Sequence, residues 1–178
     1  MLTERLEKMK VRVRNRECKR IRTTPTPELL EEFTQQNMNW MQRSACLTRR
    51  MCESEVSIIE PDERIVFTRT IPDVPGLWSH EEWEEITKTK TLHELGPINN
   101  ICADWGMVLD QGLLKRKEIA EQTKKRMKHD PQAVEFLDHA IDTIHSVLNL
   151  AKKYEQKARE MGKTEVVKIL QNVPAHKP

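Results

Sequence analysis

The residues best suited to ligand chemistry form a short polar cluster within an otherwise apolar stretch. Asn99, Asn100 and Asp104 are interspersed with apolar residues just after a Gly-Pro pair. Amide side chains donate and accept hydrogen bonds, so Asn99 and Asn100 can orient a hydroxyl or carboxylate group of a small ligand. The same amides can instead cap a helix, with Asp104 in its first turn, where a carboxylate is favoured. Both interpretations, a substrate site and a helix start, are consistent with the sequence.

A second candidate combines carboxylates and imidazoles on consecutive turns of one segment. The spacing of Asp142 and His145 is the carboxylate-x-x-His spacing of helix bundles that bind metal ions. Such bundles need a second helix with the same pattern, and none is evident. His139 and His145 also fall outside the apolar stripe of this segment. We therefore interpret the cluster as a solvated polar face and predict no metal site.

The four cysteines are Cys18, Cys46, Cys52 and Cys102, and they form neither a CxxC pair nor a zinc-binding spacing. Cys46, Cys52 and Cys102 sit beside apolar residues, which is typical of buried, unreactive thiols. We predict no catalytic residue in this chain. Reduced thiols, with no signal peptide and no apolar run near the ~20 residues of a membrane span, predict a cytoplasmic protein.

The charge distribution is balanced except at the N-terminus. The formal net charge is +2, yet residues 1–23 carry nine Lys or Arg against three Glu. Such a segment can contact phosphate groups, but it holds no aromatic residue for base stacking. We interpret residues 1–23 as a solvated or partner-facing basic segment and do not expect nucleic-acid binding.

Helices are the elements expected to position these residues. Thr26 and Pro27 mark one helix start, and Ser79 begins an S-x-x-E capping box. Asp130 precedes a long stripe of apolar residues at the helical period of 3.6, and Thr164 is expected to cap a final helix. The predicted helices span about 27–51, 80–88, 131–161 and 165–173.

Residues 56–70 are predicted to form a pair of β-strands. Two β-rich runs, 56–59 and 64–70, flank Pro61 and Asp62, which is typical of a turn between strands. Residues 2–22 show both helical and alternating periodicity, so the sequence leaves their structure open. The predicted fold is mostly α with a short β-hairpin.

The order of these pieces resembles the N-terminal region of glycyl radical enzymes, the pyruvate formate-lyase-like family. The pieces are VSIIEPDERIVFTRT, the Pro-rich VPGLWSHEEW, the polar cluster before DWGMVLDQGLL, and NLAKKYEQKAREM leading to VPAHKP. The resemblance covers the chain from about residue 20 to its end. Each piece is degenerate alone, and the ordered set is fairly specific.

The resemblance implies an α/β barrel several times longer than this chain. Such a barrel shelters a glycyl radical near its C-terminus and a thiyl-forming Cys on a mid-chain loop, and a radical-SAM activating enzyme installs the radical. Neither loop is present here. The resemblance thus implies that residues 1–178 are an N-terminal fragment with the barrel core largely absent, made of the basic segment 1–23 and a helical region 24–178.

The resemblance also implies function. A complete enzyme of this kind is a formate acetyltransferase or a radical lyase cleaving a C–C, C–O, C–N or C–S bond of a small polar metabolite under anaerobic conditions. It is expected to be a homodimer, while this chain alone is expected to bind no cofactor and to be inactive. The alternative is a free-standing helical module that binds a partner subunit or nucleic acid without catalysis.

The resemblance gives the polar cluster a specific role. In dehydratase-like members a Gly-His pair precedes an Asp-aromatic-Gly motif, and the His reaches the substrate. Alignment on Asp104, Trp105 and Gly106 places Asn99 at the Gly position and Asn100 at the His position. An Asn side chain cannot relay a proton near neutral pH as an imidazole can, so a diol-dehydratase activity is not favoured. Asn100 can still bind a polar group of the substrate.

Overall fold

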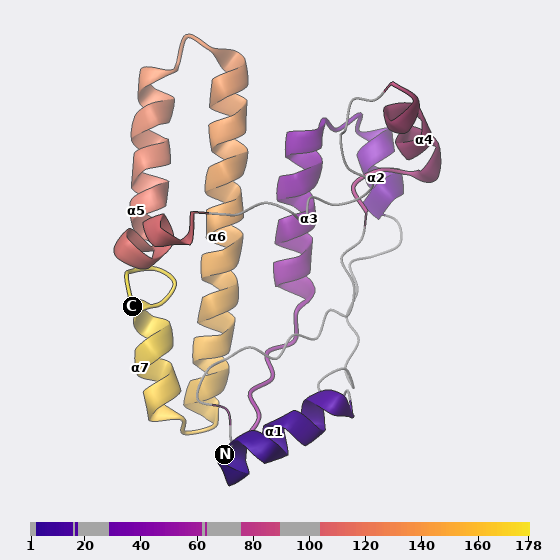
Figure 1. Cartoon of the computed structure of the whole chain (residues 1–178). Helices are drawn as coiled ribbons and strands as arrows, with labels where there is room; N and C mark the ends of the chain where they lie inside the picture. The colour runs from indigo at the N-terminus through magenta and orange to yellow at the C-terminus, as the bar shows by residue number, and fades with distance from the viewer. Residues whose placement is uncertain (1–2, 16, 18–28, 62, 64–75, 90–103) are drawn as a thin grey trace.

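The computed structural model describes residues 3–15, 17, 29–61, 63, 76–89 and 104–178, and the regular structure within these ranges is helical (Figure 1). Within residues 2–22, whose periodicity was ambiguous, Glu4–Arg14 form a helix. The helices are α1 (Glu4–Arg14), α2 (Leu29–Gln35), α3 (Trp40–Ser54), α4 (His80–Lys88), α5 (Trp105–Arg126), α6 (Pro131–Glu160) and α7 (Thr164–Asn172).

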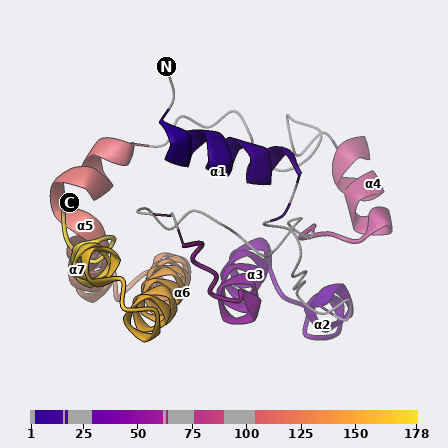
Figure 2. The same ribbon diagram turned by 90° about the horizontal axis from the view of Figure 1, so that it is seen from below.

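The long helix α6 is the centre of the arrangement. It packs against α3 on one side and against α5 and α7 on the other. Seen from below, α7, α6, α3 and α2 follow one another in a single row, and α1 crosses one face of this row (Figure 2). In the described ranges, no helix is both long and apolar enough to cross a membrane. The row of α7, α6, α3 and α2 is one layer, and α1 lies on one of its faces.

Two small hydrophobic clusters lie within this layer. One joins α6 and α7 through Tyr154, Ala158 and their neighbours, and the other joins α2 and α3 around Phe33. Although α6 has 30 residues, only Ser146, Tyr154 and Ala158 are buried in it. Its apolar Phe136 is 49% exposed. The described residues thus leave much of the predicted apolar stripe of α6 only partly covered.

Local capping signals set two of the helix starts as predicted. The Asp130 carboxylate accepts hydrogen bonds from the N–H groups of Gln132 and Ala133, at 3.0 and 3.1 Å, and α6 begins at Pro131. Ser79 and Glu82 form the predicted capping box of α4. These caps satisfy N–H groups that have no partner inside the helix.

The predicted cap of α7 was wrong by one residue. Lys163 is the N-cap, without a side-chain cap hydrogen bond, and Thr164 is the first helical residue. The preceding Gly162 has φ of 67°, and the next N–H, from Lys163, donates to the carbonyl oxygen of Ala158 at 2.9 Å. This C-terminal turn of α6 sets where α7 begins, because it fixes the direction in which the chain leaves the helix.

The predicted helix over 27–51 is two helices in the part that is described. The chain breaks between α2 and α3 at Asn37, which has φ of 48°. Asn39 then starts α3 through a capping box with Gln42: its side chain accepts from main-chain N–H groups, and the Gln42 side chain accepts from the Asn39 N–H at 3.0 Å. Asn tolerates the left-handed conformation and is a strong N-cap, so the two Asn residues end one helix and start another. Thr26 and Pro27 lie outside the described residues.

The part of the predicted β-hairpin that the structure describes is not a strand. Residues 56–59 are not a strand, and residues 64–70 lie outside the described ranges. Two lysines from the α6–α7 region hold the segment around 52–63 instead, each donating to three main-chain carbonyl groups. Lys153 Nζ donates to Cys52, Glu53 and Glu55, and Lys163 Nζ donates to Glu60, Pro61 and Glu63. The two ammonium groups thus bind carbonyl groups on both sides of residues 56–59. Ile59 is buried against α6 and α7, so this segment packs against the helices.

Arg43 of α3 connects three segments. Its guanidinium group donates to both carboxylate oxygens of Glu82 on α4, at 2.8 and 2.7 Å. It also donates to the main-chain carbonyl oxygens of Met38 and Leu77, at 2.9 and 3.0 Å. The group lies 4.8 Å from the centre of the Trp78 ring, a cation–π contact. Arg43 is only 4% exposed, so α4 is held to α3 mainly through one buried cation.

The Arg43–Glu82 pair predicts an acid sensitivity of folding. The hydrogen bond from Arg43 holds the pKa of Glu82 below its ordinary value of 4.5. A carboxyl group with a lowered pKa in the folded state stabilises the fold fully above its unfolded pKa, and this stabilisation is lost as the pH falls through the folded pKa. The wild type should therefore lose more unfolding free energy below pH 4.5 than Glu82→Gln does.

Urea unfolding measured from neutral pH down to about pH 3 checks this result. Glu118→Gln is the matched control, because the pKa of Glu118 is also lowered, by Lys115, but both side chains are half exposed. Solvent screens such a surface pair, so this variant should follow the wild-type pH dependence closely. A Glu82→Gln profile that superimposes on the wild type would contradict the prediction.

Candidate functional site

Asp104 is the only one of the three predicted substrate-binding residues within the described ranges, and Asn99 and Asn100 lie outside them. Asp104 is exposed and is the N-cap of α5: its Oδ1 accepts a hydrogen bond from the Met107 N–H at 3.2 Å. The expectation that the two Asn residues cap this helix, with Asp104 in its first turn, was therefore wrong, because α5 begins only after Asp104. The substrate-binding role of all three residues stays a prediction.

The residues that follow Asp104 leave the start of α5 exposed to solvent. A Cβ atom at Gly106 would lie 3.1 Å from Asp104 Oδ1, so the glycine leaves room for the capping carboxylate. Trp105 is 70% exposed and Leu109 is 57% exposed. The Asp-Trp-Gly sequence thus places a carboxylate and a large exposed ring next to each other at a helix N-terminus.

A break within α5 sets the direction of this first helical part. Gly112 has φ of 75° and ψ of 169°, which is not helical, and the two halves of α5 meet there. After the break, the N–H groups of Leu113 and Leu114 donate to the carbonyl oxygens of Pro174 and Ala175, at 2.9 and 3.0 Å. Figure 1 shows the short first part of α5 turned away from the long part that pairs with α6. Main-chain carbonyl groups of the C-terminal segment therefore cap the second half of α5.

The C-terminal segment is itself held in a compact turn. The His176 N–H donates to the carbonyl oxygen of Asn172 at 2.6 Å, and the Asn172 side chain donates to the carbonyl oxygen of Lys177 at 2.7 Å. A Cβ atom at Gly112 would lie 2.5 Å from main-chain atoms of Ala175 and His176. The segment that caps α5 is thus fitted against a position that only glycine can occupy.

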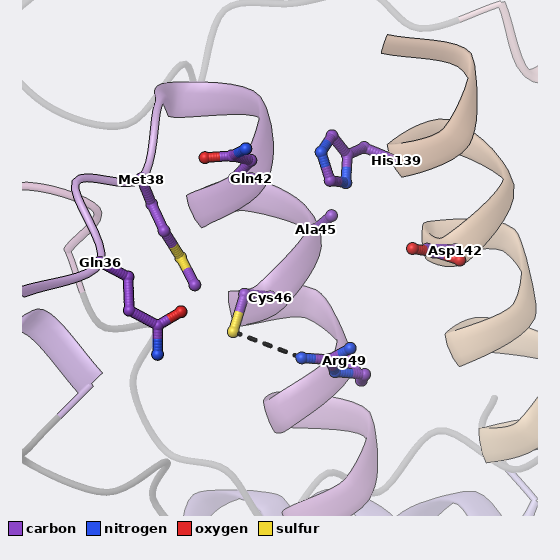
Figure 3. A pocket seen from close by; sticks show the side chains of 8 residues that line it. All are labelled: Gln36, Met38, Gln42, Ala45, Cys46, Arg49, His139 and Asp142. Carbon is purple, nitrogen blue, oxygen red and sulfur yellow. Dashed lines mark hydrogen bonds between the residues drawn. The ribbon is translucent and has the colours of Figure 1, made fainter. Parts of the chain in front are cut away.

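A separate polar hollow of about 300 Å³ lies over α3 (Figure 3). Ala45 and Cys46 of α3 line it, and the turn between α2 and α3 borders it on one side. His139 and Asp142 project toward it from α6 on the other side. The lining therefore combines a small apolar surface with hydrogen-bonding and charged groups.

Arg49 and Asp142 carry opposite charges and line this hollow, yet among the described residues these two form no ion pair with each other. The Arg49 guanidinium group donates to the Cys46 sulfur at 3.7 Å. A second hollow of about 170 Å³ also has Arg49 and Asp142 in its lining and extends toward His145. The two hollows thus share a cation and an anion at their common boundary.

Polar contacts hold α3 and α6 together on either side of these hollows. The Glu135 carboxylate of α6 accepts hydrogen bonds from the side chains of Asn39 and Gln42, at 2.7 and 3.0 Å. At the other end of α3, Lys153 of α6 binds the terminal carbonyl groups, the nearest at 2.6 Å. The helices are joined at both ends, and polar and apolar side chains line the space between these contacts.

Three side chains of the first hollow were already candidates in the sequence analysis. We predicted that His139 and Asp142 lie on a solvated face and that Cys46 is a buried thiol. Cys46 and Cys52 are buried, which confirms that prediction, whereas Cys18 and Cys102 lie outside the described residues. Arg49 was missed, because one Arg among many charged residues carries no signal in the sequence. Across the described ranges, no three His, Cys, Asp or Glu side chains are placed to hold a metal ion.

A comparison with known protein families matches the C-terminal part of the chain to one family. The family described as pyruvate formate lyase-like matches residues 79–178, more than half of the chain. The match begins at the N-cap of α4 and includes Asp104, both halves of α5, α6, α7 and the C-terminal segment. No curated protein matches the sequence. The family expected from the ordered sequence motifs is therefore confirmed, and the chain belongs to the pyruvate formate lyase-like family.

Proposed function

We propose that this chain is the N-terminal helical portion of a glycyl radical enzyme. The enzyme would be a formate acetyltransferase or a radical lyase that cleaves a C–C, C–O, C–N or C–S bond of a small polar metabolite in the anaerobic cytoplasm. The family match over residues 79–178 is the observation that carries this proposal. The row of α7, α6, α3 and α2 supports it, because a layer with a partly covered apolar stripe needs further structure to bury that stripe.

In this proposal the chain supplies binding and support rather than radical chemistry. The glycyl radical and the thiyl-forming Cys would lie in the barrel, a radical-SAM activating enzyme would install the radical, and the complete enzyme would be a homodimer. Asn99, Asn100 and Asp104 would contact the polar substrate at the start of α5. The docked C-terminal segment would position Asp104, since it sets the direction of residues 104–111.

The proposal predicts a product much longer than 178 residues. An antibody against residues 79–178 should detect such a product in source cells grown without oxygen. After treatment with the activating enzyme and S-adenosylmethionine under anoxia, the immunopurified product should show the EPR doublet of a glycyl radical. The 178-residue chain treated in the same way should show no doublet, because it contains neither radical loop.

Two outcomes would contradict the proposal. If the antibody detects only a product of 21.0 kDa, the chain acts by itself, and the alternative of a helical interaction module is favoured. A doublet arising from the 178-residue chain would show that the radical-bearing glycine lies within it.

A further inference from the structure

We propose that α7 and the C-terminal segment 173–177 form a strap that releases as one unit, and that the docked strap sets the direction of residues 104–111. In the docked state the strap caps the second half of α5 at Gly112. In the released state this cap is lost, and the first half of α5 is no longer held in one direction. The proposal rests on the proposed function in one respect: if Asp104 contacts the substrate, release of the strap also moves a substrate-binding residue.

One side of α7 anchors the strap. Val166 and Val167 are 4% and 8% exposed and belong to the cluster that includes Tyr154 of α6. Lys163, the N-cap of α7, donates from its ammonium group to three main-chain carbonyl groups within residues 60–63. The strap is therefore held at its start by a cation and in its middle by buried valines.

The C-terminal segment moves with α7, because two hydrogen bonds close it onto the last turn of that helix. The His176 N–H donates to the carbonyl oxygen of Asn172 at 2.6 Å, and the Asn172 side chain donates to the carbonyl oxygen of Lys177 at 2.7 Å. Figure 1 shows the resulting loop between the end of α7 and α5. A displacement of α7 therefore carries the segment away from α5.

At its far end the segment meets α5 where that helix is broken. Gly112 is not helical, so the N–H groups of Leu113 and Leu114 lack their usual partners inside the helix and donate to the segment instead. These contacts link α6, α7, the segment and α5 in an unbroken series. Contiguous contacts of this kind often open together as one cooperative unit.

The first half of α5 has little packing of its own to hold its direction. Its Trp105 and Leu109 are 70% and 57% exposed. Arg116 spans the break by donating to the Met107 sulfur and to the Gln111 side chain, but both contacts lie at the surface. A thioether sulfur is also a weak acceptor. The docked strap is therefore the main restraint on the direction of this half.

Native-state hydrogen exchange in low urea tests whether the strap opens as one unit. The amides of Leu113 and Leu114 donate to the segment, and the amide of Leu170 lies within α7. All three should share one opening free energy and one dependence on urea. Amides in the middle of α3 should show a larger opening free energy, because they exchange only when the whole chain unfolds. This measurement needs only the wild type.

Two substitutions on opposite sides of α7 test its coupling to α5. Val167→Ala removes methyl groups from the buried contact with α6, so it should speed exchange at Leu113 and Leu114 about tenfold. Ile169→Ala is the matched control on the same helix, because Ile169 is 48% exposed. It should leave exchange at these two amides within about twofold of the wild type.

Residual dipolar couplings of the Met107 and Leu109 amides test whether the strap sets the direction of the first half of α5. In the wild type these couplings should fit the same alignment as the amides of α6. In Gly112→Ala the added Cβ would lie 2.5 Å from main-chain atoms of the segment, which prevents docking. The two couplings should then fall to less than about half of their wild-type values, while those of α6 stay the same.

Three results would overturn the proposal. Exchange at Leu113 and Leu114 that follows whole-chain unfolding would show that the strap has no separate release. Equal exchange at these amides in the wild type and Val167→Ala would show that the segment opens independently of α7. Unchanged dipolar couplings in Gly112→Ala would show that the strap does not set the direction of α5. None of these measurements involves the radical, so their failure leaves the proposed function standing, and a missing glycyl radical leaves the strap standing.

Discussion

Replacing Gly112 with alanine should lower the free energy of unfolding by about 3 kcal/mol and release the C-terminal segment from α5. Gly112 has φ of 75°, a conformation that costs a non-glycine residue roughly 1–2 kcal/mol. The added Cβ would also lie 2.5 Å from main-chain atoms of Ala175 and His176. Moving these atoms away breaks two main-chain hydrogen bonds, worth about 1 kcal/mol each.

Hydrogen exchange and urea unfolding together test this expectation. The amides of Leu113 and Leu114 donate to the C-terminal segment, so they should lose protection in Gly112→Ala while amides in the middle of α6 keep theirs at matched stability. Gly162→Ala is the matched control, because Gly162 also has positive φ, 67°, but nothing lies within 4 Å of its added Cβ. It should cost only the conformational strain, roughly 1–2 kcal/mol.

Equal costs for the two glycine substitutions would mean that the contact with the C-terminal segment adds nothing to stability. Unchanged protection at Leu113 and Leu114 in Gly112→Ala would lead to the same conclusion. If the predicted difference is found, residues 173–176 are an integral part of the α5 structure and determine the direction in which Asp104 is presented.

Replacing Arg43 with methionine should cost about 4 kcal/mol, the largest effect expected of any single ion-pair residue in the described ranges. Methionine keeps much of the buried volume but removes the guanidinium group. The carboxylate of Glu82 then loses its bidentate partner, and the carbonyl groups of Met38 and Leu77 lose their donors. A partly buried carboxylate without its cation is strongly destabilising.

A double-mutant cycle separates the ion pair from the other contacts of Arg43. Glu82→Gln should cost less than Arg43→Met, because the introduced amide is neutral and Arg43 keeps its two carbonyl partners and its contact with Trp78. The double variant should be more stable than the sum of the single effects predicts, because once the pair is broken the second loss costs little.

The control for this experiment is an exposed arginine on the same helix. Arg50 pairs with Glu32 at 3.1 Å, and its side chain is 44% exposed, so Arg50→Met should change stability by about 0–1 kcal/mol. Similar costs for Arg43→Met and Arg50→Met would show that burial of Arg43 contributes little. The predicted contrast would show that one cation holds α4, where the family match begins, to α3.

Local signals in the sequence were sufficient for several helix starts. Asp130 and Ser79 cap α6 and α4 as predicted, because an N-cap satisfies N–H groups two or three residues away and needs no distant partner. The split between α2 and α3 was also marked locally, by Asn37 and by the Asn39 capping box with Gln42. The continuous apolar periodicity of this region concealed that break.

Contacts between distant parts of the chain decided the features that the sequence missed. The break at Gly112 depends on carbonyl groups of Pro174 and Ala175. The segment at 56–59 forms no strand while Lys153 and Lys163 bind carbonyl groups on either side of it. In each case, groups about sixty or a hundred positions apart satisfy main-chain hydrogen bonds, and no local pattern encodes such a partner.

The sequence by itself determined the family, the predominance of helix and the starts of α4 and α6, because these depend on ordered motifs, periodicity and neighbouring residues. Only the tertiary structure decided that α5 breaks at Gly112 and that Arg49 and Asp142 line one hollow without pairing. Those arrangements depend on where helices end and how they pack. A charge's partner or its lack of one is a property of three-dimensional distance rather than of spacing along the chain.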